Sequence, residues 1–173
     1  MTREYPDDPA GEFPAPPRTV TDAEGREIEL VPADDAERGR LVEMYLDFDP
    51  ADRAQGIPPV KEEAIEKWLD TILEGDCVNV VARHDGHAVG HATLVPDRHD
   101  EHELAIFVLQ SFQGAGIGTM LLETLLGQGQ VEGIGRVWLT VERWNDPAIA
   151  LYRKMGFETS NAESFEIEMA IQL

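Results

Sequence analysis

The sequence lacks the residues that several common kinds of site require. It has a single cysteine, Cys77, among 173 residues, which excludes an internal disulfide and a thiolate metal cage. Its longest clear apolar run, Leu104 to Leu109, is far shorter than the roughly 18 residues that cross a bilayer. We therefore expect a reduced, cytoplasmic protein that does not enter a membrane.

Positive charge is also scarce. Lysine and arginine number 14 against 34 aspartates and glutamates, which gives a formal net charge of −20. Nucleic acids and anionic membranes require a basic surface, so neither is expected as a partner. The only lysines are Lys61, Lys67 and Lys154. An acidic composition poor in lysine resembles that of halophilic proteins, in which concentrated salt screens self-repulsion.

Length and composition favour one domain that follows a short arm. A hydrophobic content of 42% over 173 residues is ordinary for a globular chain with a full core. Five prolines lie among acidic residues within residues 1–17, where they oppose helix formation. We predict a flexible, Pro-rich acidic arm over residues 1–17 and a single domain over residues 18–173.

Periodicity and turn signals predict alternating strands and helices in this domain. Strands are expected in a hairpin over 18–31 and over 77–83, 87–95, 103–109, 136–142 and 164–171. Helices are expected from about residue 34 to 48 and over 60–74, 116–131 and 146–155. This order predicts an α/β layered domain around a mixed sheet, and an exposed edge at 164–171 would offer a surface for a homodimer.

The most informative stretch is the glycine-rich turn at residues 113–119, Gln-Gly-Ala-Gly-Ile-Gly-Thr, between a buried strand and a helix. Glycines let backbone N–H groups converge, and a helix N-terminus adds partial positive charge, so the turn can hold a phosphate. Neither the P-loop spacing nor the dinucleotide pattern G-x-G-x-x-G is present. A tight turn that binds nothing is the alternative interpretation.

Two motifs together resemble the GNAT acetyltransferases. Gln113 to Gly118 matches their Q/R-x-x-G-x-G/A acetyl-CoA loop, and Asn145 to Phe157 is similar to their N-x-x-A-x-x-L-Y-x-x-x-G-F segment. The motifs stand in the expected order, and the resemblance covers about residues 27–171. It implies a mixed, mostly antiparallel GNAT sheet of about six to seven strands flanked by four helices.

The resemblance also implies acetyl-CoA as co-substrate, no metal, and a set of roles. Backbone groups of Ile106, Phe107 and Val108 would pair with the pantetheine arm, and an N–H near Val108 would polarise the thioester carbonyl. Asn145 would contact the cofactor or cap its helix, and Tyr152 would protonate the departing thiolate or simply pack in the core. The pyrophosphate would be bound by Gln113, Gly114, Ala115, Gly116, Ile117, Gly118 and Thr119.

The glycine loop has no lysine or arginine, although many relatives carry one there. Phosphate affinity must then come from backbone N–H groups and from a nearby cation. Arg143, Arg153 and Lys154 are candidates for binding the adenosine 3′-phosphate.

An amine with a pKa of about 10.4 must lose a proton before it attacks, so a base is needed. Glu103 is the first candidate, because several family members have a carboxylate at this position. Glu101 and His102 are rivals, since a one-residue bulge would change which side chain faces the cleft. Glu142 is a fallback.

These features predict direct acetyl transfer from acetyl-CoA to a primary amine within a ternary complex. The acidic loop over residues 47–59 favours a cationic acceptor. The chain resembles haloarchaeal GNAT proteins regarded as protein lysine acetyltransferases, which favours a protein lysine. A small amine (a polyamine or an aminoglycoside-like molecule) is an alternative acceptor. A non-catalytic acetyl-CoA-binding module and a structural domain with an empty loop are the alternative functions.

Overall fold

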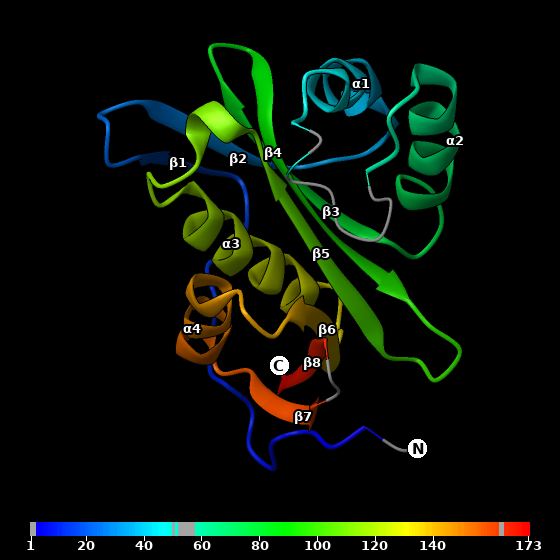
Figure 1. Ribbon diagram of the computed structural model, residues 1–173, viewed down its shortest axis with the longest axis vertical. Coiled ribbons are helices and arrows are strands. Elements are labelled where there is room, and N and C mark those ends of the chain that lie inside the picture. Colours follow the sequence, from blue (N-terminus) through cyan, green and yellow to red (C-terminus); the bar gives the residue numbers. More distant parts are fainter. Residues whose placement is uncertain (1–2, 50, 52–57, 163–164) are drawn as a thin grey trace.

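A computed structural model of the chain contains one sheet of eight strands with helices on both faces (Figure 1). The structure describes residues 3–49, 51, 58–162 and 165–173. The strands are β1 (Arg18–Thr21), β2 (Glu27–Pro32), β3 (Val78–His84), β4 (His87–Pro96), β5 (His102–Val108), β6 (Arg136–Glu142), β7 (Glu158–Ala162) and β8 (Glu166–Gln172). The helices are α1 (Arg38–Leu46), α2 (Glu62–Ile72), α3 (Ile117–Val131) and α4 (Asp146–Met155), with short 3₁₀ turns η1 (Asp35–Glu37) and η3 (Gln110–Phe112).

The strand order is β1-β2-β3-β4-β5-β6-β8-β7, and every neighbouring pair is antiparallel except β5 and β6. This confirms the mixed, mostly antiparallel sheet with four helices. The sheet has eight strands, whereas six to seven were expected, because β7 was not predicted. The expected exposed edge at 164–171 is wrong, since β8 lies between β6 and β7 and is paired on both sides.

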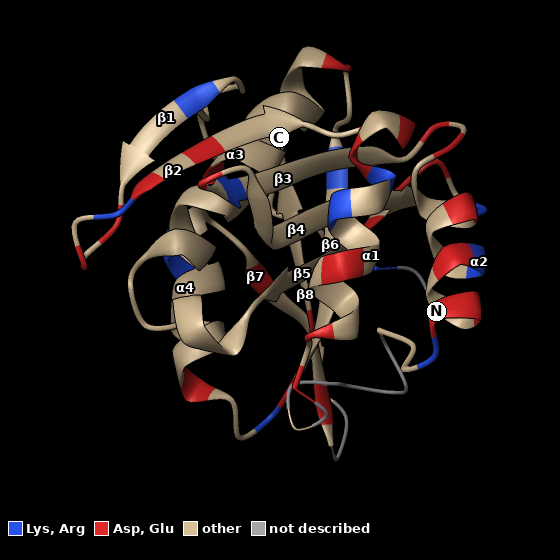
Figure 2. Ribbon diagram, turned by 90° about the horizontal axis from the view of Figure 1, so that it is seen from above, with Lys and Arg blue, Asp and Glu red and all other residues tan. Residues whose placement is uncertain are grey.

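Apolar side chains bury both faces of the sheet. On one face, α3 and α4 cover Val137, Leu139 and Val141, which alternate along β6 as the pleat of a strand requires. On the other face, α1 and α2 pack over a second cluster around Tyr45 and Phe107. Figure 2 shows the strands running between these two pairs of helices, with acidic residues spread over α1, α2 and the strand ends. No helix among the described residues is long and apolar enough to cross a membrane.

Local signals set the helix boundaries where the cap residues are strong. The Asn145 side chain accepts a hydrogen bond from the Ala148 amide at the start of α4, and Gly156 ends that helix with φ +115°. The first helix begins later than expected, because the Asp34 side chain accepts a hydrogen bond from the Ala36 amide and starts the turn η1 first.

The N-terminal arm lies extended against the domain. The Ala10 amide donates to the Gln172 carbonyl at 2.9 Å, and the Phe13 amide donates to the Gln130 side chain at 2.9 Å. The arm also passes over α3 at Gly127, where a Cβ atom would lie 2.2 Å from the Pro14 carbonyl oxygen. The flexibility of this arm stays a prediction.

Candidate active site

Strands β5 and β6 stay together for only two residue pairs. His102 is opposite Val137 and Glu103 is opposite Trp138, after which β5 follows β4 and β6 follows β8. From residue 104 to residue 108, β5 therefore has a strand partner on one side only. Backbone polar groups on its other side are available to a ligand that runs along the strand.

The hydrogen-bond pattern shows which residues face this open side. The Leu109 amide donates to the Val89 carbonyl of β4 at 2.9 Å. Backbone groups alternate between the two sides of a strand, and the register with β4 is continuous, so Phe107 also faces β4. Ile106 and Val108 face the open side, and the Gln113 side chain donates to the Val108 carbonyl at 2.9 Å. Phe107 thus differs from its neighbours, because its backbone groups face β4 and only its side chain, on the α1 and α2 face, is available to a ligand.

The glycine loop forms an open cradle at the start of α3. Gly114 and Gly116 have φ values of +75° and +87°, a region that favours glycine. A Cβ atom on Gly114, Gly116 or Gly118 would meet nothing within 4 Å. The first helical bond joins the Met120 amide to the Gly116 carbonyl, so the three amides before Met120 have no acceptor within the helix. These amides, those of Ile117, Gly118 and Thr119, suit a phosphate oxygen.

The side chains of this loop play a structural part. Ala115 and Ile117 are buried, and the Ala115 carbonyl accepts a hydrogen bond from the Ala23 amide in the β1–β2 turn. Only their backbone groups are therefore available to a ligand, while the exposed glycines leave space in front of them.

A cation that the sequence did not single out lies beside the loop. The Arg26 guanidinium stacks on the Phe112 ring at 4.1 Å and donates to the Ser111 carbonyl at 3.4 Å. It also pairs with Asp22 at 2.7 Å. No local motif connects Arg26 to the loop, because Arg26 and Ser111 are 85 positions apart in the sequence. Of the expected cations, Arg153 and Lys154 are exposed in the last turn of α4, and their phosphate contact stays a prediction.

Glu103 is exposed where β5 and β6 diverge. The continuous register of β4 and β5 contains no bulge, so Glu103 and Phe107 share the face that α1 and α2 cover. Desolvation raises the pKa of Glu103, and the nearby Asp97 and Glu168 carboxylates raise it further, while Arg3 lowers it. A raised pKa suits a carboxylate that must accept a proton.

The rival bases have other environments. Glu101 accepts a hydrogen bond from the Tyr5 hydroxyl, which occupies one of its oxygens. His102 is buried on the opposite face, where its Nδ1 atom has no partner among the described residues. Glu142 is exposed at the far end of β6. The structure thus brings Glu103 to the point of divergence and directs His102 away from it.

Tyr152 is buried on the inner face of α4. Its ring packs against Phe157 at 5.7 Å between centroids, and no described residue accepts a hydrogen bond from its hydroxyl. Burial raises the pKa of Tyr152 to about 12, so the hydroxyl keeps its proton at neutral pH. A protonated hydroxyl without a protein partner is the state that a proton donor requires.

An aromatic cluster with a buried polar chain lies on the α1 and α2 face. The Tyr45 ring packs against Trp68 at 5.1 Å and Phe107 at 5.8 Å. Its hydroxyl bonds to Nδ1 of buried His91, whose Nε2 bonds to the Asn79 side-chain oxygen at 2.7 Å. Burial lowers the pKa of His91 to about 3, so the ring is neutral and donates through Nε2. This chain of hydrogen bonds fixes α1 against β3 and β4.

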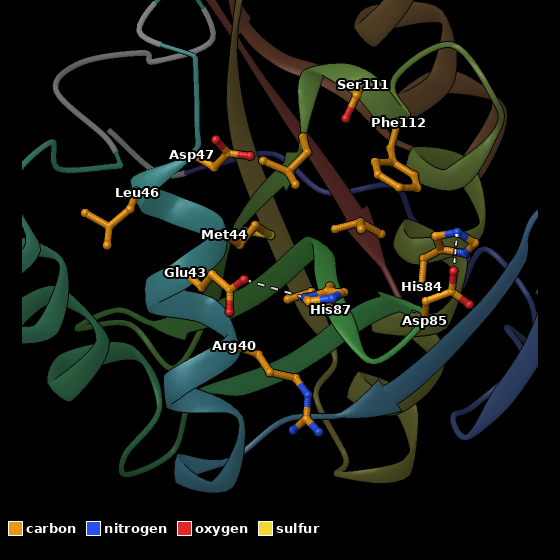
Figure 3. A pocket seen from close by; sticks show the side chains of 13 residues that line it. Arg40, Glu43, Met44, Leu46, Asp47, His84, Asp85, His87, Ser111 and Phe112 are labelled. Carbon is orange, nitrogen blue, oxygen red and sulfur yellow. Dashed lines mark ion pairs between the residues drawn. The ribbon is translucent and has the colours of Figure 1, made fainter.

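A pocket of about 600 Å³ lies between α1, the β3–β4 turn and η3 (Figure 3). Its wall carries a Glu43–His87 pair at 3.6 Å and a His84–Asp85 pair at 3.3 Å. Phe112 borders it immediately before the glycine loop. None of the residues predicted to bind the cofactor lines this pocket. It lies on the α1 side of the loop, apart from the open edge of β5.

Comparison with solved structures shows the same fold. The GNAT domain of S. lividans PAT superimposes with a TM-score of 0.77 over 90% of this chain and 96% of that one, at 19% identity. The PaiA N-acetyltransferase from Thermoplasma acidophilum, in complex with coenzyme A, gives a TM-score of 0.67 over 84% and 99% of the two chains, at 20% identity.

The chain is also similar in sequence to proteins named as acetyltransferases. An uncharacterized N-acetyltransferase of Mycobacterium bovis is 33% identical over 89 residues, 51% of this chain and 57% of its own length. The mycothiol acetyltransferase of Nocardia farcinica is 33% identical over 111 residues, 64% of this chain and 34% of its own length. The match thus spans little more than half of the mycobacterial relative. Residues 40–157 match the acetyltransferase (GNAT) family, and the chain belongs to that family.

Proposed function

We propose that this protein is an acetyl-CoA-dependent N-acetyltransferase that transfers the acetyl group directly to a primary amine in a ternary complex. The observation that carries the proposal is the continuity of two binding features. The open edge of β5 at Ile106 and Val108 leads toward the open amides at the start of α3. Gln113, at the start of the glycine loop, donates from its side chain to the Val108 carbonyl. A ligand with an extended arm that ends in a pyrophosphate would fit along this strand edge and into the glycine loop.

The residues fit such a co-substrate because the loop is free of side chains where phosphates would lie. The amides of Ile117, Gly118 and Thr119 would bind the pyrophosphate. The backbone of Ile106 would hold the pantetheine arm, and the Val108 amide would face the thioester end of that arm. Acetyl-CoA supplies the activated acyl group.

Three groups of the chain would move or stabilise charge. Glu103 would accept the proton of the amine, directly or through water, and its exposure leaves room for the acceptor. The Val108 amide would donate to the carbonyl oxygen as that atom gains negative charge. The Tyr152 hydroxyl would donate a proton to the departing sulfur.

The charge of the site favours a cationic acceptor. Asp97, Glu166 and Glu168 all act on Glu103 and are all carboxylates. A protein lysine fits this charge, as does a small amine such as a polyamine or an aminoglycoside-like molecule. The names of the relatives support no single acceptor, since they include a mycothiol acetyltransferase and a ribosomal protein bS18-alanine N-acetyltransferase. We also propose that the protein acts in the cytoplasm at high salt, and the net charge of −20 supports the high salt, which would screen its self-repulsion.

Release of free thiol from acetyl-CoA tests the proposal, measured in molar KCl with an acetylatable protein and a set of small amines. We expect thiol release that depends on an amine and that falls strongly in Glu103→Gln. Binding of acetyl-CoA without amine-dependent thiol release would instead support the non-catalytic binding module.

A further inference from the structure

Near the start of the N-terminal arm, the side chain of Arg3 lies in a defined site on the sheet. The Arg3 guanidinium lies 3.7 Å from the centroid of the Trp138 ring. Its Nε atom donates to Glu168 at 2.7 Å, and its Nη1 atom lies 3.6 Å from Asp97 and 3.7 Å from Glu101. Trp138 itself donates from its indole nitrogen to Asp97 at 2.9 Å.

We call Trp138, Asp97, Glu101 and Glu168 the cation site. An aromatic face together with carboxylates is the usual surround of a guanidinium or ammonium group. The side chain of Arg3 is only 18% exposed there. The cation is therefore largely removed from water and is held on more than one side.

The cation site adjoins the proposed base. Trp138 is paired in register with Glu103, and both side chains lie on the face of the sheet opposite α3. Neighbouring strands are about 4.8 Å apart, so a cation over Trp138 and an amine at Glu103 are separated by the length of a short alkyl chain.

The arm does not need Arg3 to stay on the domain. The Ala10 amide bonds to Gln172 beside the start of β6, and the Phe13 and Gly127 contacts lie on α3. Arg18 also bonds to the Thr124 hydroxyl of α3 at 2.9 Å. These contacts anchor the arm, so Arg3 stays close to the cation site whether or not its side chain occupies that site.

We propose that the cation site binds a second positive charge of the acceptor and that Arg3 occupies this site as an intramolecular competitor. The proposal rests on the proposed function and narrows its substrate class to a dibasic amine, in which the reactive primary amine is joined by a short chain to a guanidinium or ammonium group. A bound acceptor of this kind displaces Arg3 and directs its free amine toward Glu103.

Two amines of similar length separate an effect on the second positive charge of the acceptor from an effect on its reactive amine. Agmatine carries a guanidinium group besides its primary amine, and n-butylamine does not. In Arg3→Ala we expect kcat/KM for agmatine to rise about fivefold to tenfold, a change of the size that one charge-assisted contact gives, while that for butylamine changes less than twofold. Arg18→Ala is the control: it removes an arginine that bonds to α3, away from the cation site, and should leave kcat/KM for both amines unchanged. Adding Glu168→Gln to Arg3→Ala should abolish the gain for agmatine.

An equal change for both amines would overturn the proposal, because Arg3 would then act on Glu103 alone. No change for either amine would also overturn it.

A binding measurement separates this failure from a failure of the proposed function. Agmatine is titrated without acetyl-CoA, and the indole N–H resonance of Trp138 is followed by NMR. We expect saturable binding in Arg3→Ala that is weaker in the unchanged protein, whatever the turnover. Absence of binding in Arg3→Ala would overturn the cation site even if acetyl transfer to other amines were found.

Discussion

Glu103 and Trp138 form the last pair between β5 and β6 before the two strands diverge. Their side chains lie on the face opposite α3, whereas the glycine loop starts α3 itself. A ligand held by the loop and an amine that reaches Glu103 would thus approach the open edge of β5 from different directions. This arrangement is what direct transfer in a ternary complex requires.

Replacing the proposed base should remove a proton acceptor without unfolding the protein. We expect Glu103→Gln to lower kcat about a hundredfold, the usual contribution of general base catalysis. In the unchanged protein, kcat/KM should fall as the pH falls through the raised pKa of Glu103, and the variant should lack this acid limb. The melting temperature should be equal or higher at neutral pH, because the folded state disfavours the charged carboxylate. Glu142→Gln is the control. An equal loss of kcat in Glu142→Gln would contradict the assignment of Glu103 as the base.

We expect Tyr152 to have a chemical role and Tyr45 a structural one, and replacing each by phenylalanine distinguishes the two roles. Tyr152→Phe should lower kcat about a hundredfold, with a change in the free energy of unfolding below about 1 kcal/mol, since its hydroxyl has no partner among the described residues. Tyr45→Phe should cost about 1–3 kcal/mol of stability, because it leaves the buried His91 nitrogen without a donor. Steady-state rates and urea unfolding measure both. A large stability loss in Tyr152→Phe with unchanged kcat would make Tyr152 a packing residue.

Buried His91 should make the fold sensitive to acid. Its pKa is lowered to about 3 in the folded state, against about 6.5 in an unfolded chain, so the unfolded state binds the proton more readily. Its contribution to stability is therefore complete above about pH 6.5 and is lost as the pH falls toward 3, at about 1.4 kcal/mol per pH unit. Urea unfolding between pH 6 and pH 4 should show this slope, and His91→Gln should reduce it by that amount. An unchanged slope in the variant would show that His91 is charged in the folded protein.

Salt should stabilise the fold. A net charge of −20 on 173 residues produces self-repulsion that salt screens, and the Debye length falls from about 10 Å at 0.1 M to about 3 Å at 1 M. We expect the melting temperature to rise with KCl over this range and to change less in a matched series with sucrose. A melting temperature that falls with KCl would mean that the ion pairs contribute more than the net repulsion costs.

The sequence predicts most of the fold where the local signals agree. The bounds of β6 and α4 are those expected, because β6 alternates in polarity, and Asn145 and Gly156 mark the ends of α4. β7 was missed because Glu158–Ala162, with the sequence ETSNA, has no apolar alternation and is paired on one side only. The position and conformation of the glycine loop follow from its motif, since Gly114 and Gly116 have the positive φ that such a turn requires.

The remaining parts of the site depend on contacts between distant residues. Arg3 meets Trp138 and Glu168 only because the arm passes around the sheet, and no local pattern in a Pro-rich segment predicts such a path. The sequence motif groups Phe107 with Ile106 and Val108, but in the structure the Phe107 backbone faces β4 and is not open to a ligand, because the β4–β5 register decides which backbone groups are open. Arg26 reaches the loop through the β1–β2 turn.

Calorimetric titration of acetyl-CoA in molar KCl tests whether the glycine loop binds this co-substrate. Gly116→Asp places a carboxylate among the open amides of the loop, and Gly133→Asp is its matched control at the other end of α3, where φ is +80° and a Cβ atom also meets nothing within 4 Å. We expect binding to the unchanged protein and to Gly133→Asp, and loss of binding in Gly116→Asp. No binding to the folded, unchanged protein, or equal binding to both variants, would contradict it.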